Sequence, residues 1–221
     1  MVNALKQLLS YFYPAFCVSC RVIINGCDAL CISCFASLPR ASVLRITLPK
    51  GTALAVHAVT HYEGVGAFLV AAKEGRNQEG ARTLGRLLAQ YVKAHALVYD
   101  VIVPVPLHWV RFLWRGYNQA ALMARALVSE GAYISRSFCR MKKTKDQKHL
   151  SGAARRRNVA HAFGTGWFVS AHRVRQDIAG KHVLIVDDVY TTGSTVRELA
   201  AVIERFKPAS ITVLLGCRVL R

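Results

Sequence analysis

The sequence predicts an α/β fold in which helices cover both faces of a parallel sheet, with a small cysteine-rich module on the N-terminal side. Apolar, β-branched stretches alternate with helical segments between residues 53 and 221, which is typical of a parallel sheet buried on both faces. Five of the seven cysteines fall within residues 17–34. The 221 residues suit one domain of roughly 100–200 residues with a small addition.

The composition favours a folded protein that attracts anions. Hydrophobic residues make up 53% of the chain and charged residues 19%, so a core is expected and disorder is not. Thirty Lys and Arg against twelve Asp and Glu give a net charge of +18, which draws nucleic acid, an anionic membrane surface or a phosphorylated small molecule. No apolar run reaches the ~18 residues of a membrane-spanning helix, and the N-terminal residues lack a signal-peptide layout. We therefore expect no membrane span and a cytoplasmic location.

The first residues predict a short amphipathic helix. Leu5, Leu8, Leu9 and Phe12 follow helical spacing until Pro14 ends the pattern. We expect this helix to pack on the body of the protein. Docking on a membrane surface or on a partner helix is the alternative.

Two Cys-x-x-Cys pairs, Cys17/Cys20 and Cys31/Cys34, are separated by ten residues. Each pair can place two thiolates on one side of a tight turn, and two pairs complete a tetrahedral site of four sulfurs. That site suits Zn²⁺ and leaves no open position for a substrate, so we predict a structural zinc ion. A redox-active or merely buried set of thiols is the alternative, and Cys27 is the expected non-ligand.

A linker is expected over residues 38–52, where Pro39, Pro49 and Gly51 occur. We therefore divide the chain into a module at 1–52 and a main domain at 53–221. Hydrophobic periodicity predicts the elements of the main domain. Strands are expected at 53–62, 100–106 (running into a loop), 133–139, 183–186 and 211–215, and helices at 65–73, 79–97, 117–130 and 194–206. A long polar stretch follows residue 139 and ends near residue 162.

The most specific motif starts at the predicted strand 183–186. Asp187 and Asp188 follow at its carboxyl end, where open α/β sheets bind ligands, and a loop rich in hydroxyls and glycine then opens a helix. Backbone N–H groups and hydroxyls of such a loop bind phosphate, helped by the helix N-terminus. Two acids beside a phosphate site need a reason, because their charge repels phosphate. The acids are explained if their carboxylates accept hydrogen bonds from the paired hydroxyls of a sugar. The motif therefore predicts a site for a ribose 5-phosphate derivative.

This run of strand, acid pair and T-x-G-x-T resembles the ribose-phosphate signature of type I phosphoribosyltransferases. The resemblance implies that fold for the main domain, and it implies that Asp187 and Asp188 bind the ribose hydroxyls of phosphoribosyl pyrophosphate (PRPP). Mg²⁺ is the metal ion expected with PRPP. The 5′-phosphate would be held by the loop residues Thr191, Thr192, Gly193, Ser194 and Thr195. Some nucleobase transferases carry an acid where this chain has Thr191, so ordinary purine salvage is not expected.

Two basic segments lie where that family binds pyrophosphate and closes its site. Residues 103–107 occupy the place of the pyrophosphate loop, with Arg111, Arg115 and Gly116 beyond it, and the planar guanidinium suits phosphate oxygens. The later stretch corresponds to the flexible loop that closes over PRPP and excludes water. Its candidate residues are Arg140, Lys143, Thr144, Gln147, Arg155 and Asn158. The alternative is that these basic residues are simply solvated.

The arrangement as a whole resembles the ComF/GntX family of competence-associated phosphoribosyltransferase-like proteins. The resemblance rests on the four-cysteine module, the segments PVPL…RGYNQA and VDDVYTTGST, and Lys73-Glu74-Gly75. It implies a role in DNA uptake during natural transformation, in the cytoplasm, after single-stranded DNA has entered. Single-stranded DNA and other competence proteins are then the expected partners beside PRPP.

A basic cluster favours contact with nucleic acid. Nine Lys or Arg and one acid, Asp146, fall between Arg136 and Arg157, more positive charge than a single pyrophosphate needs. Aromatic side chains among cations suit stacked single-stranded bases. Four aromatic residues interleave with arginines nearby: Trp109, Phe112, Trp114 and Tyr117. The alternatives are a solvated basic loop and aromatic residues that belong to the core.

The residues leave three hypotheses for function open. The first is a Mg²⁺-dependent phosphoribosyltransferase that uses PRPP and acts in DNA uptake, with no catalytic base assigned and the acceptor unknown. The second is a non-catalytic adaptor that handles single-stranded DNA and is gated by PRPP. The third is a nucleobase salvage phosphoribosyltransferase.

Overall fold

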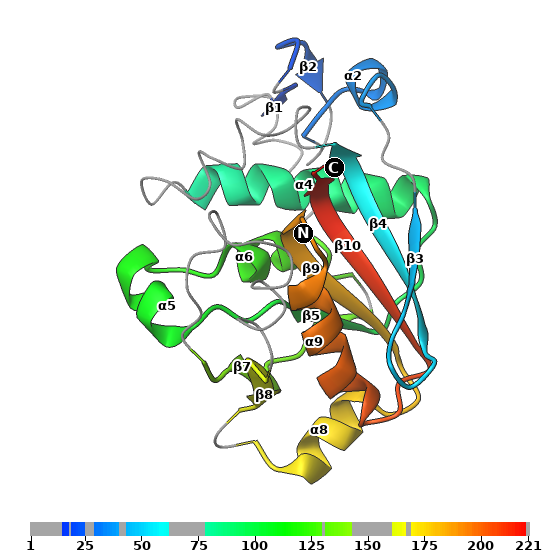
Figure 1. The fold of residues 1–221 in the computed structure, drawn as a ribbon. Helices are drawn as coiled ribbons and strands as arrows, with labels where there is room; N and C mark the ends of the chain where they lie inside the picture. The colour runs from blue at the N-terminus through cyan, green and yellow to red at the C-terminus, as the bar shows by residue number, and fades with distance from the viewer. Residues whose placement is uncertain are drawn as a thin grey trace.

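The computed structural model describes residues 15–17, 19–24, 29–39, 43–61, 78–129, 131–142, 161–166 and 169–219. Within them, a six-stranded sheet forms the centre of the molecule, in the order β3-β4-β10-β9-β5-β6 (Figure 1). Its strands are β3 (Leu44–Thr47), β4 (Ala53–His61), β5 (Val101–Pro104), β6 (Tyr133–Ile134), β9 (His182–Tyr190) and β10 (Ser210–Arg218). In this sheet β3 at one edge pairs antiparallel with β4, and the other pairs are parallel. The predicted α/β fold is confirmed.

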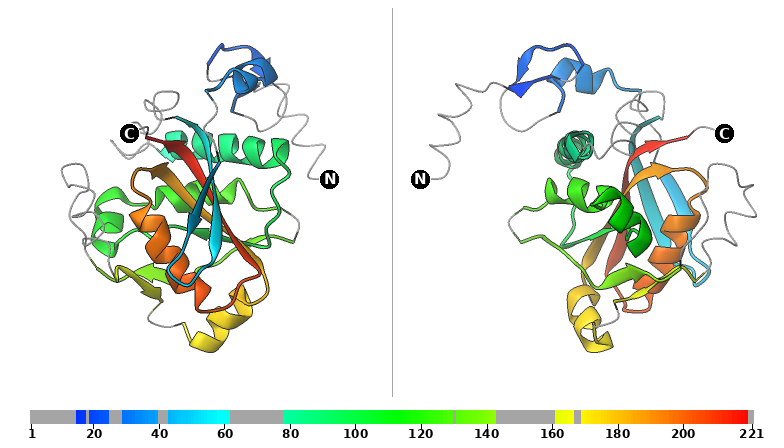
Figure 2. Two further views of the ribbon diagram at one scale, coloured as in Figure 1. Left: turned by 45° about the vertical axis from the view of Figure 1, so that its right-hand side comes forward. Right: turned by 90° about the vertical axis from the view of Figure 1, so that its left-hand side faces the viewer.

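Alternating side chains along the central strands build two cores, one on each face of the sheet. Val183 and Ile185 of β9 pack with α8 and α9, whereas Leu184 and Val186 pack on the opposite face with α4 and α6. Figure 2 shows α4 and α6 on one side of the sheet and α9 on the other. These helices are α4 (Gln78–Ala94), α6 (Gln119–Arg125), α8 (Ala171–Ile178) and α9 (Ser194–Glu204).

Helices α4 and α6 lie in close contact because a glycine removes a side chain between them. A Cβ on Gly85 would lie 2.9 Å from the carbonyl oxygen of Met123 and 3.2 Å from the Cβ of Ala126. Leu84 and Leu88, on the apolar face of α4, are buried against the sheet. The helix predicted at 79–97 is therefore present as α4, with its apolar face in the core.

The N-terminal module packs on α4 and β4, above the sheet in Figure 1. Leu30 is buried in the same core as α4, and its carbonyl oxygen accepts a hydrogen bond from Nε2 of Gln90 at 3.1 Å. Thr60 Oγ1 of β4 donates to the carbonyl oxygen of Pro39 at 2.7 Å. The module comprises β1 (Ala15–Phe16), β2 (Ile23–Ile24) and α2 (Ile32–Ala36). The division of the chain at residue 52 stays a prediction.

Three differences from the predicted elements concern short segments. β3 lies inside the expected linker at 38–52, because these residues pair with β4. The helix expected over 117–130 starts at Gln119, where the Asn118 side chain accepts a hydrogen bond from Ala120 N–H at 3.0 Å. The strand expected over 133–139 is divided between β6 and β7 (Phe138–Arg140). Ser135 and Ser137 lie between these two strands, and their hydroxyls donate hydrogen bonds to the Asp177 carboxylate of α8 at 3.3 and 2.6 Å.

Further elements were not predicted. They are α5 (Trp109–Arg115), α8 and β8 (Phe163–Thr165), which pairs with β7. α8 is only eight residues long and buries two of its apolar residues, Val174 and Ile178. The helices expected at 5–12 and 65–73, Lys73-Glu74-Gly75 and Cys27 lie outside the described residues. Among the residues that are described, no helix combines the length and apolar character needed to cross a membrane.

Candidate phosphate site and metal centre

Asp187 and Asp188 lie near the carboxyl end of β9, between β5 and β10 in the middle of the sheet. The sequence predicts them after the strand, whereas β9 continues through them because β10 pairs with it as far as Tyr190. Both acids are partly exposed, and Oδ1 of Asp187 accepts a hydrogen bond from the Asp188 N–H at 3.0 Å. Partly open carboxylates at this edge can accept hydrogen bonds from ligand hydroxyls.

The side-chain alternation of β9 shifts by one residue at the acid pair. Ile185 packs on the α9 face, whereas Val189 packs on the α4 face. A regular strand would put both on one face, since they are four residues apart. Gly216 of β10 lies beside this irregularity, and a Cβ there would lie 3.0 Å from the carbonyl oxygen of Asp188. The shift in alternation therefore falls between Val186 and Val189, the stretch that contains both acids.

Residues 191–193 join β9 to α9, and with Ser194 and Thr195 of its first turn they form the predicted phosphate loop. Gly193 is the N-cap and has left-handed backbone angles, φ 70° and ψ 5°. Gly193 has no side chain with which to cap the helix, the Thr192 hydroxyl accepts a hydrogen bond from the Ser194 N–H at 3.5 Å, and the first turn of α9 holds no acid. The Thr192 and Ser194 hydroxyls lie 3.0 Å apart. Uncapped N–H groups, hydroxyls and the helix dipole together suit a phosphate.

Arg140 of β7 brings positive charge to the acid pair. Its guanidinium lies over the Phe163 ring, 5.3 Å from the centroid. Burial lowers the pKa of Arg140, Arg111 lowers it further, and Asp187 raises it. Arg111 and Asp187 thus each lie within electrostatic range of Arg140. An arginine stays protonated even when its pKa falls, so the acids sit in a locally positive field.

The segment after β5 is tied to the same edge of the sheet. Val105 N–H donates to the Val186 carbonyl oxygen at 2.9 Å, and Asn118 Nδ2 donates to the Val105 carbonyl oxygen at 3.0 Å. Arg115 donates from Nη1 to Oε1 of buried Gln119 at 2.9 Å. Loop 103–107, the predicted pyrophosphate loop, is thus held beside the carboxyl end of β9.

The other predicted site residues either make no contact with the acid pair or lie outside the described residues. Gly116 is the C-cap of α5, exposed and left-handed at φ 80°, so it ends a helix and no contact ties it to the acid pair. Of the aromatic residues, Tyr117 belongs to the core, whereas the other three are exposed: Trp109, Phe112 and Trp114. Five predicted residues of the flexible loop lie outside the described residues: Lys143, Thr144, Gln147, Arg155 and Asn158.

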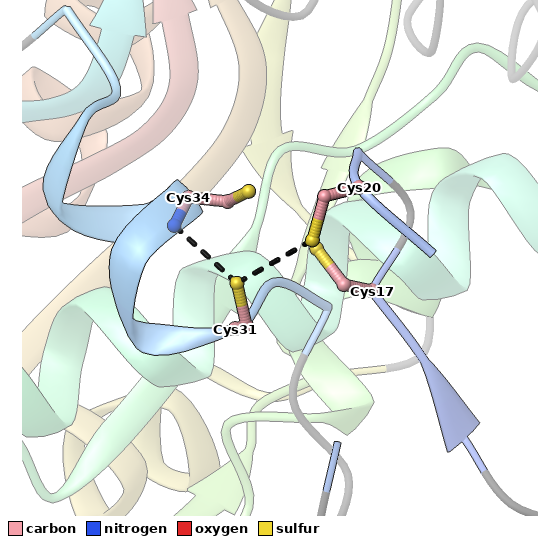
Figure 3. Close-up of side chains that lie close together, drawn as sticks. All are labelled: Cys17, Cys20, Cys31 and Cys34. Atoms are coloured by element: carbon pink, nitrogen blue, oxygen red, sulfur yellow. Dashed lines mark hydrogen bonds between the residues drawn. The ribbon is translucent and has the colours of Figure 1, made fainter. Parts of the chain in front are cut away.

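The four predicted metal ligands come together in the N-terminal module (Figure 3). The sulfur atoms of Cys17, Cys20, Cys31 and Cys34 all lie within 4.8 Å of one another. The Cys20 and Cys31 sulfurs are 3.7 Å apart, close to the ~3.8 Å that a tetrahedral zinc with bonds of about 2.3 Å requires. Cys31 Sγ also accepts a hydrogen bond from Cys34 N–H at 3.4 Å. This geometry can hold a metal ion such as zinc.

The ionisation of these thiols is consistent with a cation between them. Burial raises the pKa of Cys17, but backbone hydrogen bonds from Cys20, Cys31 and Ser19 outweigh it and lower the pKa to about 6. A hydrogen bond with Ser19 lowers the pKa of Cys34, yet the thiols of Cys20 and Cys31 raise it to about 12. Four thiolates cannot share this space without a compensating positive charge, and a divalent metal ion supplies it.

The sequence analysis missed two side chains that contribute to this part of the structure. The Tyr190 ring occupies the space that a Cβ of Gly193 would take, and Glu198 of α9 accepts a hydrogen bond from His161 N–H at 3.1 Å. Tyr190 lies within the quoted motif, but no local pattern says that its ring folds back under the loop. The Glu198 carboxylate thus ties α9 to the segment that begins at His161.

Comparison with known proteins gives three findings. A family model described as phosphoribosyl transferase domain matches residues 76–218. DNA utilization protein YhgH of Salmonella typhimurium is 39% identical over 153 residues, 66% of this chain and 63% of that protein. Competence protein F of Haemophilus influenzae is 35% identical over 139 residues, 60% of this chain and 58% of that protein. This chain thus covers less than two thirds of these curated relatives.

A solved structure described as the allosteric regulatory enzyme of purine biosynthesis aligns at 21% identity with a TM-score of 0.39, over 62% of this chain and 25% of that chain. The names of the curated relatives confirm the resemblance to competence-associated proteins that the motifs indicate.

Proposed function

Because the chain belongs to the phosphoribosyl transferase domain family, we propose that it binds PRPP with Mg²⁺ and acts in DNA uptake in the cytoplasm. The observation that carries the proposal is one continuous unit, in which the acid pair of β9 is followed by a short loop whose N-cap residue, Gly193, starts α9. Asp187 and Asp188 would accept hydrogen bonds from the ribose 2′- and 3′-hydroxyls. Loop residues 191–195 would bind the 5′-phosphate through N–H groups and hydroxyls.

The arginines beside the acids would bind the pyrophosphate of PRPP. Arg140 lies within electrostatic range of both Asp187 and Arg111, and a guanidinium binds phosphate oxygens in a bidentate way. We propose the same role for Arg115, which a hydrogen bond to Gln119 orients. The flexible-loop residues Lys143, Thr144, Gln147, Arg155 and Asn158 would complete the closure over the ligand.

Mg²⁺ fits this site on the chemistry of its donors. It prefers oxygen ligands and is commonly held by one or two carboxylates together with substrate phosphates, and two partly exposed carboxylates lie beside the phosphate loop. When bound, the ion would neutralise charge on the departing pyrophosphate. The described residues would orient the ribose and keep water from its C1 atom.

In a transfer reaction the bond from C1 to the pyrophosphate oxygen breaks, and a bond from C1 to the acceptor forms. We assign no general base among the described residues, and the acceptor is not proposed. The chain has Thr191 where some nucleobase transferases have an acid, which disfavours nucleobase salvage. A non-catalytic adaptor gated by PRPP is the second candidate, and the names DNA utilization protein and Competence protein F favour a role with DNA.

We also propose that the protein contacts single-stranded DNA and other competence proteins. The support is the net charge of +18 and the nine basic residues between Arg136 and Arg157. The four-cysteine cluster would hold a structural zinc ion, because a site of four sulfurs leaves no open position.

Calorimetric titration with PRPP, with and without Mg²⁺, tests the ligand site. Binding is expected to require Mg²⁺ and to be lost in the Asp187→Asn/Asp188→Asn variant. Asp100→Asn is the control, because Asp100 accepts a hydrogen bond from His182 N–H at the opposite end of β9. Unchanged affinity in a double variant with a native circular dichroism spectrum would contradict the assignment.

Two further assays separate the candidate functions. Release of pyrophosphate with a panel of acceptors distinguishes a transferase from an adaptor. Binding of an oligo-dT strand is expected to weaken steeply with salt, since counterions are released from the phosphates. Binding that is insensitive to salt, or no binding, would contradict a role for the basic residues in DNA contact.

A further inference from the structure

Arg140 lies on a small antiparallel sheet that is separate from the main one. β7 pairs with β8 so that Arg140 stands opposite Phe163, and the Met141 N–H extends the pairing by donating to the Ala162 carbonyl oxygen at 2.7 Å. Opposed residues of such a pair point to the same face, which accounts for the Arg140 guanidinium lying over the Phe163 ring. The position of Arg140 is therefore set by the position of β8.

The small sheet packs against α9, the helix that starts at the phosphate loop (Figure 1). Phe163 of β8 is buried in the same core as Val196 and Leu199 of α9. Apolar packing of this kind is non-directional, so it does not by itself fix the level of β8 along the helix. A directional contact is needed to hold Arg140 at a fixed distance from the phosphate loop.

Glu198 of α9 supplies such a contact. Its carboxylate accepts a hydrogen bond from the His161 N–H at 3.1 Å, and His161 lies two residues before Phe163. His161 has a left-handed φ of 55°, which is uncommon for a residue with a side chain. A backbone conformation of this kind persists where the surrounding structure holds it, and the hydrogen bond from Glu198 is one contact that does so.

We infer that Glu198 is a positioning residue, which sets the spacing between Arg140 and the phosphate loop. Glu198 lies in the helix that begins at this loop, and it is tied to the strand that faces Arg140. Arg140 in turn lies within electrostatic range of Asp187 and Arg111. A ligand with a 5′-phosphate and a pyrophosphate would contact both ends of this unit, and a preformed spacing lowers the ordering cost of binding it.

Two simpler roles for Glu198 predict other results. A contact that only stabilises the fold would weaken the binding of every ligand to the same extent. An effect of the carboxylate charge would be lost in glutamine as well as in alanine. Positioning through the backbone is instead retained in glutamine, because the amide oxygen of that side chain still accepts a hydrogen bond from an N–H group.

The test compares two ligands by calorimetry with the full chain: PRPP with Mg²⁺, and ribose 5-phosphate, which has no pyrophosphate. Glu198→Ala is expected to weaken PRPP binding about tenfold, the effect of one misaligned charged hydrogen bond, and to change ribose 5-phosphate binding by less than about twofold. Glu198→Gln should bind both ligands like the unmodified chain. Glu204→Ala is the matched control, since Glu204 is also half-buried on α9 but lies at its opposite end, and it should leave both affinities unchanged.

Hydrogen exchange measured without ligand checks the contact itself. In Glu198→Ala, residues 161–165 are expected to exchange faster, whereas β9 and β10 keep their protection. Unchanged exchange at 161–165, an equal loss of affinity for the two ligands, or a glutamine variant as weak as the alanine variant would each overturn the positioning role.

The difference between the two ligands rests on the proposed function. If the unmodified chain binds neither ligand, that function fails, and hydrogen exchange still decides whether Glu198 holds β8 in place. If the unmodified chain binds both ligands and Glu198→Ala loses affinity for both equally, the proposed function stands and only the role of Glu198 fails.

Discussion

The ring of Tyr190 lies directly against Gly193, in the space where any other residue would place its Cβ. Gly193 also has a left-handed φ of 70° and starts α9. Tyr190 is buried in the core under the α9 face of the sheet. Tyr190, the last residue of β9, therefore supports the phosphate loop from below. Position 193 must be glycine for two reasons: a Cβ would collide with the Tyr190 ring, and the backbone is left-handed there.

Replacement of Gly193 by alanine is expected to disrupt the phosphate loop. Gly180 is a close control, because its φ of 68° matches and nothing lies within 4 Å of a Cβ there. Gly180→Ala should cost about 1 kcal/mol of unfolding free energy, the penalty of a left-handed alanine. Gly193→Ala should cost more and abolish PRPP binding, as measured by urea unfolding and calorimetry. Equal costs in the two variants would contradict the steric role of Tyr190.

Arg140 is expected to contribute a bidentate contact that lysine cannot replace. Arg140→Lys keeps the charge near Asp187 but loses the planar fork, so PRPP affinity should fall about tenfold, the loss of roughly 1.5 kcal/mol for one charged hydrogen bond. Arg173→Lys is the control, because Arg173 is 70% exposed on α8 and pairs with Asp177. Calorimetry that finds the same affinity in both variants would remove Arg140 from the site.

Removal of metal from the cysteine cluster is expected to destabilise the protein. Chelation, or Cys17→Ser, should lower the melting temperature measured by calorimetry, because a structural zinc ion contributes folding free energy. Cys139→Ser is the control, since Cys139 lies outside the cluster and its Sγ donates to the Thr165 carbonyl oxygen at 3.3 Å. A chain purified without zinc that melts normally would exclude the structural role.

His57 is expected to make stability depend on pH. Burial lowers the pKa of His57 below its ordinary value of 6.5, and nearby His95 lowers this pKa further. As the pH falls, His57 therefore takes up a proton in the unfolded chain before it does so in the native protein. The free energy of unfolding decreases as the pH drops from the pKa of His57 in the unfolded chain to its lower pKa in the native protein. Above both pKa values His57 does not change the free energy of unfolding with pH, and below both it lowers that free energy by a constant amount.

The His57→Gln variant should accordingly lose less unfolding free energy than the unmodified chain between pH 8 and pH 5, about the range in which histidine titrates. His172→Gln is the control, because His172 is exposed on α8 and the substitution removes a histidine without altering the buried surroundings of His57. Identical profiles for all three proteins in urea unfolding would show that His57 does not titrate differently in the native state.

The sequence by itself determined the α/β class, the acid pair with its following loop, and the four-cysteine cluster. These are local patterns: apolar periodicity reports burial on both faces of a strand, and the site residues from Asp187 to Thr195 are contiguous in one strand-loop-helix unit. The two Cys-x-x-Cys pairs likewise carry their geometry in their spacing.

Only the tertiary structure decided how distant residues meet and which side chains face solvent. Arg140 lies within electrostatic range of Asp187 although 47 residues separate them along the chain, and no local pattern encodes that proximity. The Tyr190 ring lies under Gly193 because of its direction at the end of β9. α5 shows the same limit: the sequence left open whether Trp109, Phe112 and Trp114 face solvent or belong to the core, and the structure exposes them, because a helix is oriented by everything that packs around it.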